Sequence, residues 1–241
     1  MELYIALTLF IVGFLYASVG HGGASGYIAV FSIFGIPVIQ YKPLILVLNM
    51  LVAGTGFTQF WRAGYLKWSI CWPFLITSIP AVFLGARYAI VGHLYFVLLG
   101  LALIVPTIRL LGITPKAHVQ SKPVHVPLAL LMGAVLGGLA GMLNIGGGIF
   151  LSPLLILLGW ANAKEAAASS AIFITLNSLS GLLGSTSPIY IDSQIGFWFC
   201  AAATGGFMGA YFGSARFPMV TVRTLLSVVL MIACCKLLFF M

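Results

Sequence analysis

Two glycine-rich stretches decide how this chain folds: residues 18–26 read SVGHGGASG, and residues 144–148 read NIGGG. Each stretch interrupts an apolar run and opens a short apolar segment, at 21–36 in the first half of the chain and at 146–160 in the second. A helix of about 15 residues reaches only about 23 Å, less than the roughly 30 Å of a bilayer's hydrocarbon core. Short, glycine-interrupted segments at corresponding places in two halves are the best sequence indication of a transporter's binding site.

The composition of the whole chain indicates an integral membrane protein. Hydrophobic residues make up 62% of the 241 residues and charged residues only 6%, whereas soluble domains carry about 25% charged residues. The net charge of +8 does not indicate nucleic-acid binding, because the basic residues lie singly between apolar runs, as loop charges of membrane proteins do. No cleavable signal peptide is expected, since Glu2 stands where one needs Lys or Arg. Ten apolar segments are expected to be helices, at 2–17, 21–36, 43–60, 68–87, 93–112, 126–143, 146–160, 165–184, 194–213 and 219–240.

An internal repeat relates the two halves. Residues of the first half recur after an offset of 124 residues or, in the middle of the repeat, 128 residues. The matched pairs include Gly13 and Gly137, Gly22 and Gly146, Gly85 and Gly209, and Asn49 and Asn177. Five segments per half is an odd number, so the second copy is expected to be upside down relative to the first. The sequence thus predicts one all-α integral membrane domain of about ten transmembrane helices. Its two inverted-topology five-helix repeats, at 1–113 and 127–241, are joined by a linker at 114–126, and helices 2 and 7 are short and broken by glycine.

The basic residues predict the orientation in the membrane. If all ten segments cross, eight of the 11 Lys and Arg residues collect on one side and three on the other. The eight are Arg62, Lys67, Arg109, Lys116, Lys122, Lys164, Arg216 and Arg223. If the second and seventh segments instead turn back as re-entrant loops, the split is six against five. The positive-inside rule therefore favours ten crossings of the inner (cytoplasmic) membrane, with the linker in the cytoplasm and both termini outside.

The chemistry of the two glycine-rich breaks suits an anion. Glycine lets the backbone approach a ligand closely, and a helix that starts in such a break presents free N–H groups and the positive end of its dipole. Two such starts that face one another at the repeat interface would hold an oxyanion without a basic side chain, which is costly inside a membrane. The candidate substrate-binding residues are Gly20, His21, Gly22, Gly23, Ser25, Asn49, Asn144, Gly146, Gly147, Gly148 and Asn177.

Several of these residues keep a second interpretation. Asn49 and Asn177 either bind substrate or tie helices together, because an amide in hydrocarbon must find partners. His21 either donates to the anion or carries a coupling proton, although its repeat counterpart Ile145 has no such chemistry. Glycines outside the breaks are expected to serve helix packing, namely Gly13, Gly35, Gly85 and Gly209.

No metal site, cofactor or enzymatic activity is expected. The sequence shows no cluster of metal ligands and no Ser/His/Asp set, and no acidic residue falls clearly inside a span. The four cysteines show no CxxC spacing. The residues alone therefore indicate an anion transporter in the lipid bilayer, with a passive anion channel or a non-transport subunit of a membrane assembly as alternatives.

At the two breaks the sequence resembles the sulfite exporter TauE/SafE family of membrane transporters. The resemblance rests on GHGGASGY at 20–27, NIGGGIFLSP at 144–153, the two-copy layout and the central basic linker. It implies a secondary transporter whose substrate is a small sulfur oxyanion or sulfonate: sulfite, or a related organosulfur anion such as sulfoacetate or thiosulfate. The first stretch departs slightly from the second, with Ala24 where the second has Gly148.

Overall fold

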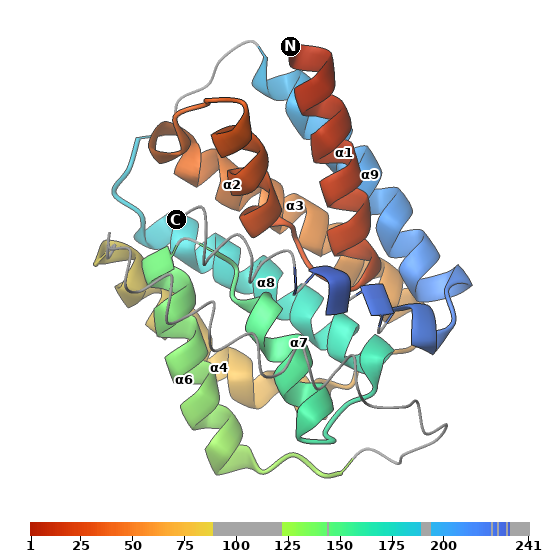
Figure 1. Cartoon of the computed structure of the whole chain (residues 1–241). Helices are drawn as coiled ribbons and strands as arrows, with labels where there is room; N and C mark the ends of the chain where they lie inside the picture. The colour runs from red at the N-terminus through yellow and green to blue at the C-terminus, as the bar shows by residue number, and fades with distance from the viewer. Residues whose placement is uncertain are drawn as a thin grey trace.

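The computed structural model describes residues 1–88, 122–143, 145–188, 194–222, 224–225, 227–229 and 231. These residues form helices and connecting loops, with no strand among them (Figure 1). The helices are α1 (Glu2–Ser18), α2 (Ala24–Ile33), α3 (Val38–Arg62), α4 (Trp68–Arg87), α6 (Val126–Leu143), α7 (Gly148–Leu157), α8 (Ala163–Gly184), α9 (Ile195–Tyr211) and the π-helix η1 (Phe212–Arg216), which continues α9. The expected segment 93–112, most of the linker, part of the last segment and Asn144 lie outside the described residues.

The described helices have the length and surface of membrane spans. Five stretches are long and apolar enough to cross a bilayer: Gln40–Arg62, Trp68–Arg87, Val126–Leu143, Ala163–Gly184 and Ile195–Arg216. Large apolar side chains on the outer faces of the helices, such as Leu7, Ile76, Leu131 and Leu183, are exposed. Exposure of this kind is unfavourable in water and favourable in lipid. The chain is therefore a multi-pass membrane protein, as its composition predicts.

α2 and α7 are half-length helices. Each has ten residues, or about 15 Å at 1.5 Å per residue, against roughly 30 Å for the hydrocarbon core. The short segments predicted after the glycine breaks are thus confirmed and are even shorter than expected. The expectation of ten full crossings is not met by these two helices, and α2 runs from the break back toward the end of the molecule at which α1 begins (Figure 1).

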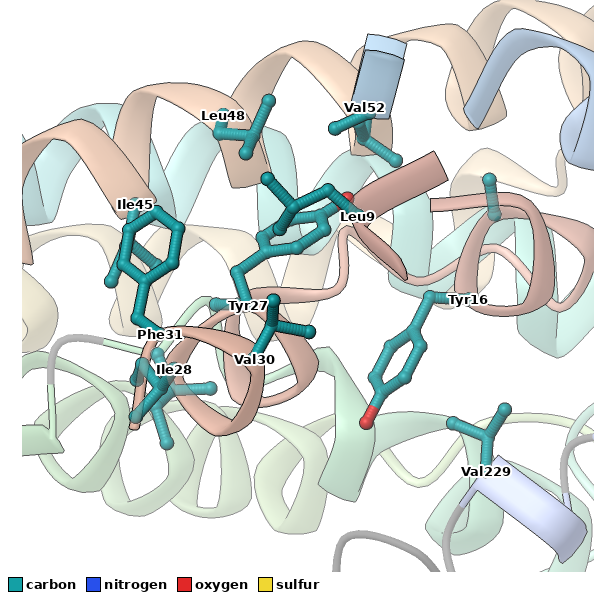
Figure 2. Packing of buried hydrophobic residues seen from close by; sticks show 14 of the residues in the cluster. Leu9, Tyr16, Tyr27, Ile28, Val30, Phe31, Ile45, Leu48, Val52 and Val229 are labelled. Carbon is teal, nitrogen blue, oxygen red and sulfur yellow. The ribbon is translucent and has the colours of Figure 1, made fainter. Parts of the chain in front are cut away.

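Apolar side chains hold α2 between its neighbours. Tyr27 and Phe31 of α2 belong to one buried cluster with Leu9 of α1 and with Ile45 and Leu48 of α3 (Figure 2). Inside a bilayer such contacts stabilise through van der Waals packing rather than through exclusion of water. This packing places the first turn of α2 at the glycine break.

Two helix pairs make the most extensive contacts: α4 with α6, and α1 with α9. The offset of 124 residues carries α1 onto α6 and α4 onto α9, so the two pairs are counterparts of one another. In each pair, a glycine allows the two helices to approach one another closely. A Cβ at Gly137 would lie 2.6 Å from Ser78 Cα, and a Cβ at Gly13 would lie 2.5 Å from the Ala202 carbonyl oxygen. The same offset relates Gly13 to Gly137 and Ser78 to Ala202.

The packing expected of Gly13, Gly85 and Gly209 is confirmed, because a Cβ at each would collide with the backbone of a neighbouring helix. For Gly35 the packing expectation is wrong. A Cβ there would meet nothing within 4 Å. Gly35 lies in the turn that follows α2 with a φ of +70°, so the shape of the turn, and not a neighbouring helix, favours glycine.

Loops that carry basic residues gather at one end of the molecule. Lys67, between α3 and α4, pairs with Glu165 near the start of α8, with 2.6 Å between Nζ and Oε1. The adjacent Lys164 donates from Nζ to the Ser214 carbonyl of η1 at 3.0 Å. The backbone N–H of Lys122 bonds at 2.8 Å to the loop between α7 and α8. These three lysines belong to the eight basic residues expected on one side of the membrane, and the structure places the three at one end of the molecule.

Exchanging two adjacent glycines of α6 for alanine tests the close packing of α4 on α6. Gly137→Ala places a methyl group 2.6 Å from Ser78 Cα, and overpacking of this kind costs about 1–3 kcal/mol. Gly138→Ala adds a methyl group with no heavy atom within 4 Å, and alanine favours a helix over glycine by up to about 1 kcal/mol. We expect the melting temperature in detergent to fall for Gly137→Ala and to stay level or rise for Gly138→Ala. Equal effects of the two exchanges would contradict the described packing.

Candidate anion-binding site

The two glycine breaks meet inside the helix bundle and line one pocket. The first half contributes Tyr16, His21, Gly22, Gly23, Ala24, Ser25 and Asn49, and the second half contributes Ile145, Gly146, Gly147, Gly148, Ile149 and Ile174. α2 begins at Ala24 and α7 begins at Gly148. The N-termini of both half-length helices therefore lie at the pocket, and the fold brings together two stretches that are far apart in the sequence.

Gly23 and Gly147 turn the backbone sharply just before each half-length helix. Their φ angles are +93° and +69°, a left-handed conformation that residues with a side chain rarely adopt. The offset of 124 relates these two residues, so both halves make the same turn at the same place. A Cβ at Gly23 would also lie 2.8 Å from the Tyr27 ring, and a Cβ at Gly147 would lie 2.8 Å from Ala140 Cβ. Both the backbone conformation and the available space thus require glycine.

Four backbone N–H groups at the breaks have no hydrogen-bond partner within the described part of the chain. They belong to Gly22, Gly23, Gly146 and Gly147, all of which are buried. Buried N–H groups are rarely left unpaired, and the interior of a bilayer offers no water to satisfy them. Successive backbone N–H groups at the start of a helix form a common anion-binding arrangement. The pocket is therefore lined by N–H hydrogen-bond donors from both halves of the chain, an arrangement that suits an anion.

Asn49 of α3 connects the two breaks. Its Oδ1 accepts a hydrogen bond of 2.9 Å from the backbone N–H of Ala24, and its Nδ2 donates to Ser178 Oγ of α8 at 2.8 Å. A Cβ at Gly146 would lie 2.5 Å from Asn49 Nδ2, and a Cβ at Gly22 would collide with the same amide. Asn49 thus satisfies an N–H group in the first turn of α2 and touches both breaks, while Nδ2 keeps a second hydrogen for a ligand.

Asn177, the repeat counterpart of Asn49, does not line the pocket. Its Oδ1 accepts from Ser78 Oγ of α4 at 3.0 Å, and its Nδ2 has no partner among the described residues. The two asparagines therefore have different surroundings, although they occupy equivalent positions in the sequence repeat. Asn49 lies at the candidate site, and Asn177 ties α8 to α4.

His21 begins a chain of neutral polar groups that runs between the halves. Its Nε2 lies 3.0 Å from Ser152 Oγ of α7, and Ser152 donates to Ser170 Oγ of α8 at 2.6 Å. Near the start of α2, Ser25 Oγ shares a hydrogen bond of 3.0 Å with Tyr16 OH. All five side chains are buried. Among the described residues no charged side chain lines the pocket, so backbone N–H groups and neutral side chains determine its chemistry.

The other residues expected at the site differ in whether they line the pocket. Gly148 lines the pocket, whereas Gly20 packs tightly against the backbone of α8. Asn144 lies outside the described residues. Tyr16 and Ile174 line the pocket without having been expected there, because a single Tyr or Ile within an apolar helix is as typical of packing as of binding.

The pocket is narrow in this structure. It has room for roughly one water molecule, and a sulfur oxyanion is larger than water. Binding such an ion therefore requires residues that line the pocket to move apart.

Replacing each asparagine by leucine tests their different surroundings. Asn49→Leu leaves the N–H of Ala24 and the hydroxyl of Ser178 without their amide partner, and a buried unpaired donor costs about 1–3 kcal/mol. Asn177→Leu removes an amide whose Nδ2 has no partner among the described residues and leaves only the hydroxyl of Ser78 without its acceptor, so we expect a smaller loss of stability. Thermal unfolding of the two purified variants measures the difference. A larger loss of stability for Asn177→Leu than for Asn49→Leu would overturn these assignments.

Comparison with known proteins identifies the family of the chain. Residues 5–237 match the family model described as sulfite exporter TauE/SafE. The chain is also similar to a protein of Sinorhizobium fredii (strain NBRC 101917 / NGR234) described as probable membrane transporter protein y4hK, with 36% identity over 239 residues that cover 97% of each chain. No solved structure matches the chain. With almost its full length matched, and with both glycine breaks inside the match, this chain belongs to the sulfite exporter TauE/SafE family.

Proposed function

We propose that the protein is a secondary transporter that moves a small sulfur-containing anion, namely sulfite or a related organosulfur anion such as sulfoacetate or thiosulfate. The observation that carries this proposal is the set of buried N–H donors at Gly22, Gly23, Gly146 and Gly147, which have no partner within the described part of the chain. These donors come from two helix starts, so their dipoles add to the attraction for negative charge. The family of the chain supports the choice of a sulfur anion over other anions.

Backbone donors suit a substrate that must be released again. A buried ammonium or guanidinium group would bind an anion strongly, and would be costly when the site is empty. The described pocket has N–H groups, one amide, one imidazole and hydroxyls, but no charged side chain. Such a site selects for a compact anion with several acceptor oxygens, which is the shape that sulfite and sulfonates share.

The arrangement of the helices supports an inverted repeat of two five-helix halves, 1–113 and 127–241. The contact of α4 with α6 is the counterpart of the contact of α1 with α9. α1 and its counterpart α6 begin at opposite ends of the molecule (Figure 1), which is the relation that an inverted repeat requires. Because one half-length helix of each repeat starts at the pocket, small movements of the halves would expose the anion to either side in turn.

The narrowness of the pocket favours this alternating mechanism over a passive channel. An open channel needs a continuous path that is wide enough for the ion, whereas the described pocket holds roughly one water molecule. A carrier, in contrast, passes through states in which its site is closed.

Counterflow across liposomes tests the proposed function. We expect unlabelled sulfite inside liposomes that contain the protein to accelerate the entry of radiolabelled sulfite. In a carrier, the binding site can return to the outside with an internal sulfite ion bound, and it is then ready to bind labelled sulfite. Asn49→Leu removes a donor to the charged ligand, which is worth about 1.5–3 kcal/mol, so uptake at low sulfite should fall roughly 10- to 150-fold. Asn177→Leu, the matched control, leaves the pocket lining unchanged. Uptake without any acceleration by internal sulfite would identify a channel, and the absence of uptake would reject sulfite as the substrate.

We further propose an orientation in the cytoplasmic membrane, with the linker 114–126 in the cytoplasm and both termini outside. The gathering of Lys67, Lys122 and Lys164 at one end supports this choice under the positive-inside rule. His125 is exposed near the start of α6 and offers a reporter position. With the native cysteines replaced, His125→Cys should react with a membrane-impermeant maleimide only after the cells are opened. Strong labelling in intact cells would reverse the orientation.

A further inference from the structure

One ring nitrogen of His21 is hydrogen-bonded, and the other has no hydrogen-bond partner among the described residues. Its side chain is buried, with a relative exposure of 1%. Nε2 lies 3.0 Å from Ser152 Oγ, and Ser152 donates its own hydrogen to Ser170 Oγ at 2.6 Å. Because the hydroxyl hydrogen of Ser152 is directed to Ser170, Ser152 accepts from His21, which assigns the hydrogen of the neutral imidazole to Nε2. Nδ1 then carries a lone pair, and it has no partner among the described residues.

The groups placed around the His21 ring and the pocket are uncharged. The ring of Tyr16 lies with its centroid 6.4 Å from the imidazole centroid, and the Tyr16 hydroxyl is bonded to Ser25. The helices packed around the pocket contribute Ser152 from α7, Ser170 from α8 and Asn49 from α3. None of these residues is acidic, and no charged side chain lines the described pocket.

The charge of the imidazole is therefore linked to the presence of the anion. A protonated His21 in an empty pocket would be a buried charge without a counter-charge, which is strongly unfavourable. His21 lines the pocket, and a neutral His21 protonated on Nε2 would offer a bound anion no donor from Nδ1. When anion and proton are both present, the imidazolium and the anion compensate one another, and Nδ1–H becomes a further charge-assisted donor.

We propose that His21 Nδ1 takes up one proton when the anion binds, so that the pocket accepts an anion and a proton together. The inference rests on the proposed function and adds the coupled ion and the residue that carries it. The proton comes from water or from the ligand itself: a hydrogensulfite ion transfers its proton to Nδ1 and is held as sulfite beside the imidazolium. The repeat counterpart is Ile145, so only the first half supplies this proton site.

Nitrogen-15 NMR of histidine-labelled protein tests the proposal directly, with sulfite as the probe at about pH 7.5. The resonances of His21 are assigned as those missing from His21→Gln, or by elimination with variants of the other three histidines. We expect the spectrum of a neutral imidazole protonated on Nε2 without sulfite, and that of an imidazolium with saturating sulfite. A His21 that stays neutral while sulfite is bound would overturn the coupling and leave the proposed function intact. Absence of sulfite binding to the wild-type protein would reject the proposed substrate as well.

Calorimetric titration gives an independent measure of the same step. Titrations with sulfite in two buffers of different ionisation enthalpy give the number of protons taken up per anion. We expect the wild-type protein to take up about one proton more than His21→Gln. As the pH rises, the affinity of the wild type for sulfite should therefore fall by about a further factor of ten per pH unit, compared with that of His21→Gln. His125→Gln is the matched control, because His125 is exposed, and its proton uptake should equal that of the wild type. Equal uptake by the wild type and His21→Gln would contradict the proposal.

Discussion

A helix that begins inside a bilayer exposes backbone N–H groups that neither water nor a preceding helical turn can satisfy. α2 and α7 both begin in this way, at Ala24 and Gly148, in the interior of the molecule. One of the exposed groups is satisfied by the side chain of Asn49, and the N–H groups of the glycines beside it have no partner among the described residues. The remainder of the fold follows from the need to enclose this polar backbone within protein. α3 and α8 pack against α2 and α7, and the glycine-lined pairs α1–α9 and α4–α6 complete the bundle around them.

The backbone of the site follows the repeat, but its side chains do not. Gly23 and Gly147 make the same left-handed turn in the two halves, so both halves offer N–H donors. Asn49 and His21, in contrast, face the pocket from the first half only, since their counterparts are Asn177, which bonds to α4, and Ile145. In our account the symmetric backbone recognises the charge of the anion. The asymmetric side chains of the first half determine which anion binds and whether a proton accompanies it.

The sequence predicted an all-helical membrane fold and the positions of several helices because membrane helices leave strong signals. Apolar runs bounded by Gly, Pro or charge locate α1, α4 and α6 to within one residue of their observed ends. The glycine breaks located the pocket, because short helices that follow such breaks in both halves are typical of a transporter's binding site. The surroundings of single side chains could not be predicted in this way. Asn177 matches Asn49 in position, but Ser78 lies within reach of its Oδ1, and Tyr16 joins the pocket only because the break folds back beside α1. Such contacts depend on how helices rotate against each other, which periodicity does not specify.

The central claim is that one anion lies between the two glycine breaks, held by N–H groups from both halves. Anomalous X-ray diffraction from crystals grown with selenite, a heavier analogue of sulfite, tests this claim most directly. Our account predicts a single strong selenium peak within hydrogen-bond reach of the backbone N–H groups of Gly22 or Gly23 and of Gly146 or Gly147, beside Asn49 Nδ2. A selenium peak at another place in the bundle, with the breaks unchanged and empty, would contradict it.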